Sequence, residues 1–268
     1  MKRVLLSLVA LTVVAFSTAA PQASDKEALR NANKLIKQMT LREKLGQLEQ
    51  FITRNGVVTG PEGVKCDIDS AVRKGEVGSF LSIRNRNEAL RLQKMAVEES
   101  RLGIPLIFGY DIIHGCKVIF PENLAMACSW NLEAVERAAR VAAEESAAAG
   151  IHWTFSPMCD ISVDPRWSRV SEGAGEDPYL GAKIAAATVR GYQGDDLSSD
   201  KTIAACVKHF AAYGAAQAGK DYNTVDMSEL MFRNLYLPPY KAALDAGAVT
   251  VMSSFNDFHG VPASGNKW

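Results

Sequence analysis

The chain has 268 residues, of which 47% are hydrophobic and 22% are charged, and its formal net charge at pH 7 is zero. This composition excludes a disordered or membrane-embedded chain and predicts a globular protein with a sizeable core. The balanced charge offers no electrostatic basis for binding a nucleic acid or an anionic membrane, so we expect neither as a partner.

The N-terminus has the organisation of a secretory signal peptide. Lys2 and Arg3 precede an apolar run from Val4 to Phe16, and small residues follow at 17–20. This order of charge, apolar segment and cleavage site is typical of export. We therefore expect residues 1–23 to be removed and the mature protein to be periplasmic or secreted, with no membrane attachment after cleavage.

Amphipathic or alanine-rich stretches alternate with short apolar runs along the rest of the chain. Helices are predicted over 26–39, 86–99, 132–150, 182–192 and 228–246, and strands over 77–83, 106–113, 152–161, 202–210 and 249–255. Thr40 and Glu43 match a capping box, and Gly247 is expected to end the last helix. The alternation predicts a parallel sheet covered by helices, the α/β class, in one domain over 24–268.

The cysteines and histidines show no metal-ligand spacing. The five cysteines are scattered without a CxxC pair, and the four histidines lack an HExxH pattern. We therefore expect no metal ion and no cofactor. Most of the cysteines are expected to be small buried residues, and the choice of any oxidised pair stays open. Their positions are Cys66, Cys116, Cys128, Cys159 and Cys206.

Polar residues follow two of the predicted apolar runs. Asp111 comes after LIFGY, and Lys208 and His209 come after IAACV. In parallel β/α proteins the carboxyl ends of the strands meet the ligand, so these side chains are candidates for a binding site. The carboxylate of Asp111 would accept hydrogen bonds from two neighbouring sugar hydroxyls or would cap a helix, and both interpretations stay open. Lys208 and His209 would donate to adjacent hydroxyls, with a buried structural pair as the alternative.

The loop after the strand predicted over 152–161 is dense in charge. Its sequence CDISVDPRWSRVSEGAGEDPYLG holds two arginines, three aspartates, two glutamates and Trp167. Arginine offers forked donors and tryptophan a flat apolar face, a combination suited to holding a pyranose ring. Some of these charges should instead form ion pairs that fix the loop, and we assign Asp164, Arg166 and Glu176 to that role.

Several motifs resemble those of family 3 glycoside hydrolases. They include MTLREKLGQL, FGYDIIHG, WTFSPMCDISVDPRWSRVSEGAGEDPYL, VKHFAAYGAAQAGKDYNTVDMSE and GVPASGNKW. The resemblance implies a (β/α)8 TIM-like barrel, followed in relatives by an α/β sandwich domain, and it is strongest to the periplasmic or secreted β-glucosidase branch. The β-N-acetylhexosaminidase branch carries a histidine in the loop after KHF, and this loop has none, which argues against that branch.

The resemblance also implies an activity and a set of sugar contacts. Members of the family hydrolyse terminal β-D-glucosyl residues with retention, using an aspartate nucleophile and a glutamate acid/base. The substrate would be a β-glucoside or an oligosaccharide. The implied sugar-binding residues are Asp111, Arg169, Lys208 and His209, and Met252 would line the same pocket. The oligomeric state stays open.

No catalytic residue is expected within this chain. The nucleophile and the acid/base of relatives lie beyond the GVPASGNKW segment, so we expect an incomplete barrel with an unpaired edge and no second domain. Phe255 stands where many relatives have a tyrosine, and Asp257 is interpreted as a loop residue. The alternatives are a non-catalytic sugar-binding remnant and a different barrel enzyme, such as an aldolase-like protein that would need an essential lysine.

Overall fold

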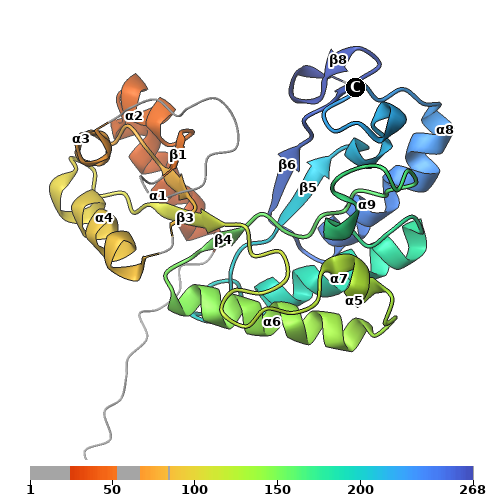
Figure 1. Cartoon of the computed structure of the whole chain (residues 1–268). Coiled ribbons are helices and arrows are strands. Elements are labelled where there is room, and N and C mark those ends of the chain that lie inside the picture. The colour runs from red at the N-terminus through yellow and green to blue at the C-terminus, as the bar shows by residue number, and fades with distance from the viewer. Residues whose placement is uncertain (1–24, 53–66, 84, 268) are drawn as a thin grey trace, which may run out of the picture. The chain divides into compact units, whose positions relative to one another are not determined.

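The computed structural model describes residues 25–52, 67–83 and 85–267 (Figure 1). The predicted signal peptide and Cys66 lie outside these residues. The chain divides into two units, 1–37 and 38–268. The helix predicted over 26–39 is confirmed as α1 (Asp25–Gln38), which lies almost wholly in the first unit. None of the helices in the described segments is long and apolar enough to cross a membrane.

The second unit is built on parallel strands that follow one another in chain order (Figure 1). Four strands form one sheet and two further strands form another, and isolated parallel bridges from Trp153 to Ala204 and from Met158 to Lys208 connect the two series. The six strands are β1 (Gln50–Ile52), β2 (Ser79–Leu81), β3 (Ile107–Tyr110), β4 (Trp153–Thr154), β5 (Cys206–Phe210) and β6 (Thr250–Ser253).

Helices connect these strands, as a parallel arrangement requires. They are α3 (Ile68–Lys74), α4 (Arg86–Glu99), α5 (Asn123–Ala127), α6 (Leu132–Ala148), α7 (Pro178–Gln193), α8 (Glu229–Met231) and α9 (Pro238–Asp245), and α2 (Leu41–Gly46) precedes β1. A short hairpin of β7 (Asp257–Phe258) and β8 (Val261–Pro262) follows β6. The predicted α/β class is therefore confirmed, although Asp257 lies in a short strand rather than in a loop.

The largest part of the core lies between β5 and the helices α6, α7 and α9. Small residues let the helices approach closely: a Cβ on Gly191 of α7 would lie 2.5 Å from the Ala139 Cβ of α6. Val207 of β5 and Ala243 of α9 are fully buried in the same cluster. This packing holds β5 in place, and β5 carries two of the predicted site residues.

Several predicted boundaries differ from the structure, and two of them have a clear local reason. The helix predicted over 182–192 begins at Pro178, because the Asp177 carboxylate accepts a hydrogen bond of 2.7 Å from the Leu180 amide and caps it. The strand predicted over 152–161 is regular only at Trp153–Thr154. Pro157 has no N–H to donate to a neighbouring strand, so the regular ladder is interrupted there and only an isolated bridge from Met158 to Lys208 follows.

The helix predicted over 228–246 is also wrong as a single element. It is divided into α8, a π-helical segment (Phe232–Tyr236) and α9. Pro238 and Pro239 lack the amide hydrogens that a continuous helix would need there. The two predicted end signals are confirmed: Thr40 and Glu43 form the capping box of α2, and Gly247, with φ of +97°, follows the end of α9.

Candidate functional site

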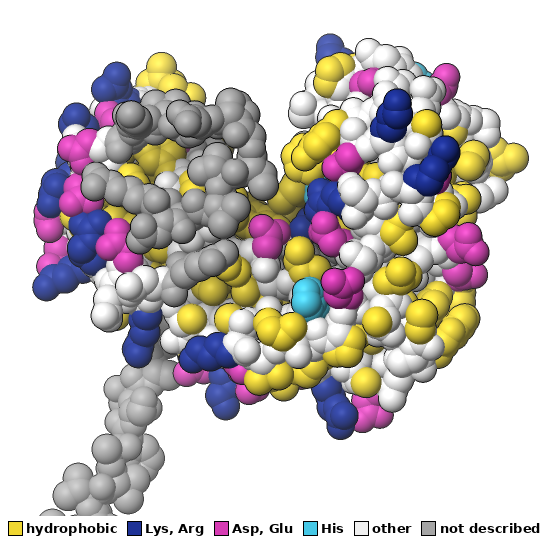
Figure 2. Space-filling model, viewed as in Figure 1, with side chains coloured by type: hydrophobic (Ala, Val, Ile, Leu, Met, Phe, Trp, Pro, Cys, Tyr) yellow, Lys and Arg dark blue, Asp and Glu magenta, His cyan; other side chains and the backbone are white. Residues whose placement is uncertain are grey.

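Four charged side chains from three separate segments meet at the carboxyl ends of the parallel strands. Asp111 directly follows β3, Arg169 and Glu172 come from the loop after β4, and Lys208 lies in β5. The Lys208 Nζ atom lies 3.2 Å from Asp111 Oδ1 and 3.7 Å from Glu172 Oε2. Figure 2 shows acidic and basic side chains meeting in the hollow near the centre of that view. The structure therefore brings three of the predicted residues together.

Arg169 and Glu172 form a two-point ion pair beside this lysine. Arg169 Nε donates to Glu172 Oε1 at 2.6 Å, and an Arg169 terminal nitrogen donates to Oε2 at 2.7 Å. Burial opposes the charged form of Glu172, but the Arg169 hydrogen bond and the charges of Lys208 and Arg169 outweigh it and lower the pKa of Glu172. Glu172 is thus a fixed anion that separates two cations.

The four side chains differ in their access to solvent. The Lys208 side chain is 3% exposed, whereas that of Asp111 is 48% exposed. No helix begins at Asp111, so the alternative role of this residue as a helix cap is wrong. The exposed carboxylate can accept hydrogen bonds from a ligand, and its hydrogen bond with the buried Lys208 ammonium fixes its position.

His209 is buried next to the same cluster. Its Nδ1 atom lies 2.8 Å from Oδ2 of Asp160, and its ring packs at 5.4 Å from that of Phe255. Burial is the main cause that lowers the pKa of His209. Met252, the remaining predicted residue, is half-buried in β6, whose residues Thr250 and Val251 pair with β5 just before Lys208.

The aromatic side chains are placed differently from the prediction. Trp167 is 2% exposed, so its face is not available to a sugar ring. Its Nε1 atom donates to Asp221 at 2.9 Å, and Asp221 also accepts a hydrogen bond from the Tyr213 hydroxyl. Two exposed rings lie beside Tyr213, those of Tyr222 and Phe255 at 61% and 54%, and they contact each other edge to face at 5.3 Å between centroids.

Tyr213 connects the aromatic residues to the charged cluster. Its ring packs at 5.1 Å from that of Trp167 and lies 5.7 Å below the guanidinium carbon of Arg169. Burial, together with the negative charge of Asp221, raises the pKa of the Tyr213 hydroxyl well above its usual range. The Tyr213 side chain is therefore neutral, and the face of its ring positions the Arg169 guanidinium through a cation–π contact.

The predicted loop ion pairs are only partly right. Arg166 and Asp164 form a two-point pair with a shortest contact of 2.6 Å, as expected. Glu176 is exposed and makes no ion pair with any described residue, so its assignment to this role is wrong. The carboxylate that does pair within the loop is Glu172, which the sequence analysis left without a role. The spacing of three residues between Arg169 and Glu172 was an available signal.

The described cysteines are free thiols. Cys159 and Cys206 are buried, Cys116 is partly buried and Cys128 is exposed. Burial raises the pKa of the Cys159 and Cys206 thiols. Across residues 25–52, 67–83 and 85–267, no three His, Cys, Asp or Glu side chains are grouped so that they could hold a metal ion.

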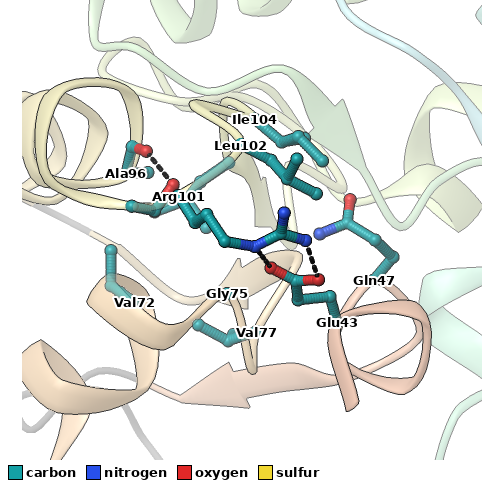
Figure 3. Close-up of a pocket in the computed structure, with 11 residues that line it drawn as sticks. Glu43, Gln47, Val72, Gly75, Val77, Ala96, Arg101, Leu102 and Ile104 are labelled. Atoms are coloured by element: carbon teal, nitrogen blue, oxygen red, sulfur yellow. Dashed lines mark hydrogen bonds and ion pairs between the residues drawn. The ribbon is translucent and has the colours of Figure 1, made fainter. Parts of the chain in front are cut away.

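A small pocket lies at the edge of the sheet opposite to the charged cluster, where the strands begin (Figure 3). Its lining includes Val77 and Leu106, which precede β2 and β3. Arg101 points at Glu43 and donates to both carboxylate oxygens at 3.0 and 2.6 Å. These hydrogen bonds lower the pKa of Glu43 to about 2. This pair joins α2 to the segment after α4 and has the role of a structural clamp.

Comparison with known proteins places the chain in a family. The family described as "Glycosyl hydrolase family 3 N terminal domain" matches residues 40–268. A "Periplasmic beta-glucosidase" of Salmonella typhimurium is 43% identical over 87% of this chain and 30% of that protein. A β-glucosidase of Listeria innocua, solved in complex with isofagomine, is 45% identical with a TM-score of 0.83, over 89% of this chain and 34% of that one. A "Beta-xylosidase" of Formosa agariphila is 31% identical over 91% of this chain and 30% of that protein.

A parallel α/β barrel domain with ion-paired polar groups at its strand ends is the class that the fold and the site define. The chain belongs to glycosyl hydrolase family 3, through the N-terminal domain of that family. The resemblance drawn from its motifs and the predicted TIM-like barrel fold are thereby confirmed. The chain spans about a third of the length of the relatives that it matches.

Proposed function

We propose that this domain binds the terminal glucosyl unit of a β-glucoside or oligosaccharide, and that the protein to which it belongs hydrolyses that unit. The observation that carries the proposal is the Asp111 and Lys208 pair, with Arg169 and His209 beside it, at the carboxyl ends of the strands. An exposed acceptor held next to fixed donors matches the alternating hydrogen-bond needs of vicinal hydroxyls. Met252 would add an apolar contact from β6.

The nucleophile and the acid/base of this proposed reaction would be supplied from outside the 268 residues. A general acid needs a raised pKa to carry its proton near neutral pH. Glu172 has a lowered pKa and is held by Arg169, and Asp111 is paired with Lys208. Both carboxylates suit binding rather than proton transfer. This assignment agrees with the span of the chain, which is about a third of its relatives.

The relatives also support a proposal for location and domain organisation. One relative is named a periplasmic β-glucosidase, and the sequence begins with the features of a signal peptide. We propose export to the periplasm or beyond the cell after removal of residues 1–23. The mature part, 24–268, would then be one barrel-type domain.

Hydrolysis of aryl glycosides tests the proposal. The protein translated from the complete reading frame that contains this sequence should release the aryl group from an aryl β-D-glucoside, and the Asp111→Ala variant should lose most of that activity. An aryl β-D-xyloside assayed in parallel decides which sugar is preferred. If the wild-type protein binds glucose and cleaves neither glycoside, a non-catalytic sugar-binding role replaces the proposed hydrolysis.

A further inference from the structure

A buried carboxylate behind His209 has no role in the site described so far. The Asp160 side chain is fully buried, with 0% of its surface exposed. Its Oδ2 atom accepts hydrogen bonds from the backbone amide of His209 at 3.0 Å and lies 2.8 Å from the Nδ1 atom of the same residue. Its Oδ1 atom lies 2.6 Å from the Tyr240 hydroxyl. Asp160 therefore contacts His209 at two positions, the backbone amide and the ring nitrogen Nδ1.

The Asp160 carboxylate fixes which ring nitrogen carries the hydrogen. An amide N–H can only donate, so Oδ2 accepts from the His209 amide, and a carboxylate, which has no hydrogen of its own, can only accept from its second partner as well. The Nδ1 atom of His209 faces that same oxygen and must therefore donate to it. In the neutral ring the other nitrogen, Nε2, then carries no hydrogen and can accept a hydrogen bond.

The surroundings of the ring favour this neutral form. Burial lowers the pKa of His209, the Asp160 contact opposes this effect, and the positive charges of Arg169 and Lys208 add to it. Among the described residues, the titratable and charged groups recorded around the ring are Asp160, Tyr240, Arg169, Lys208, Glu172 and Tyr213.

The second ring nitrogen is available to a ligand. Nε2 of His209 makes no hydrogen bond with any residue that the structure describes. The fully buried polar side-chain atoms without a partner in the same residues are Ser162 Oγ and Asn256 Oδ1, and Nε2 is not among them. The His209 side chain is 2% exposed. The ring lies beside the Lys208 cation, the proposed donor to a sugar hydroxyl.

We propose that Asp160 is a positioning residue that holds His209 in the tautomer whose Nε2 accepts a hydrogen bond from a sugar hydroxyl. Lys208 can only donate a hydrogen bond, whereas Nε2 of His209 would accept one. The two adjacent residues of β5 would therefore bind neighbouring hydroxyl groups in opposite ways, Lys208 at a hydroxyl oxygen and His209 at a hydroxyl hydrogen. This inference rests on the proposed sugar-binding function and adds to it the direction of one hydrogen bond.

Nitrogen-15 NMR of the histidine rings in the 268-residue chain tests the inference, with His209→Gln used to assign the resonances. The wild-type protein should show a protonated Nδ1 and a bare Nε2 at neutral pH, and D-glucose should shift the Nε2 resonance. A protonated Nε2 in the wild-type protein would overturn the inference. Failure of the wild-type protein to bind D-glucose would instead overturn the proposed function, because the tautomer is measured without ligand.

Variants of Asp160 separate positioning from mere support. Asp160→Ala should lose the single tautomer and weaken D-glucose binding about tenfold, as expected for one hydrogen bond to a buried partner. Asp160→Asn retains an acceptor oxygen for both His209 donors and should restore the tautomer and most of the affinity. If the alanine variant fails to fold, the asparagine variant and the wild-type tautomer remain decisive: loss of the tautomer in a folded Asp160→Asn protein contradicts the inference.

A matched pair of tyrosine variants controls for the loss of a buried hydroxyl. Tyr240→Phe removes one partner of Asp160 but leaves the carboxylate, so the tautomer should persist. Tyr192→Phe removes the hydroxyl that donates to Ile112 O, away from Asp160, and should cost similar stability. A changed tautomer in Tyr192→Phe would show that general loosening of the core sets it, which contradicts a specific role for Asp160.

Discussion

Lys208 and Asp111 lie 97 positions apart in the sequence, yet the ammonium and the carboxylate are 3.2 Å apart. Asp111 follows β3 and Lys208 lies in β5, so the lysine side chain spans the position of β4 between them. The Lys208 side chain is buried and the Asp111 side chain is half exposed, so only the carboxylate of this pair faces solvent. This asymmetry is what makes the pair suited to a polar ligand.

The anion between the two cations should be needed for stability. Replacing Glu172 by Gln leaves Arg169 and Lys208 close together without their shared negative charge, so we expect a loss of about 2 kcal/mol in the free energy of unfolding. Urea denaturation at pH 7 measures it. Glu176→Gln, in the same loop and without an ion pair to a described residue, is the control and should change stability by less than about 0.5 kcal/mol. Equal effects from the two variants would contradict the role of Glu172.

The backbone contact between two site loops should not tolerate a side chain. A Cβ on Gly214 would lie 2.1 Å from the carbonyl oxygen of Ile161. We expect Gly214→Ala to cost about 3 kcal/mol, because the neighbour is backbone and cannot rotate away. A Cβ on Gly265 would meet no atom within 4 Å, so Gly265→Ala is the matched control. Thermal unfolding followed by circular dichroism should show a lowered midpoint for Gly214→Ala alone.

The buried histidine should make stability depend on pH in a defined direction. The pKa of His209 lies below the value of 6.5 expected for the unfolded chain, so in that interval the unfolded state binds more protons. Stability should therefore be fully present above pH 6.5 and fall as the pH drops toward the folded pKa. Denaturation at several pH values measures the free energy of unfolding as a function of pH, and the slope of this dependence should be shallower for His209→Gln than for the wild-type protein. The slope should stay unchanged in His259→Gln, whose side chain is 46% exposed; a slope unaffected by His209→Gln would contradict the assignment.

The order of helices and strands was readable from the sequence, but the side-chain contacts at the site were only partly so. The helix over 86–99 was correct at both ends, because Asn85 caps it and its apolar spacing is regular. Asp111 and Lys208 could be identified because polar residues directly follow apolar runs at both positions. The burial of Trp167 was not predicted, because its hydrogen-bond partner Asp221 lies 54 positions later in the chain. Long-range pairing of this kind leaves no local pattern in the sequence.

The most direct test of the central claim is a calorimetric titration of the 268-residue chain with D-glucose, with L-glucose as the control ligand. We predict that the wild-type chain binds D-glucose selectively and that Asp111→Asn and Lys208→Met each weaken binding about tenfold or more. Lys241→Met, which removes an exposed lysine paired with Asp245 on α9, should bind as the wild-type chain does. Unchanged D-glucose affinity in both site variants would contradict the account.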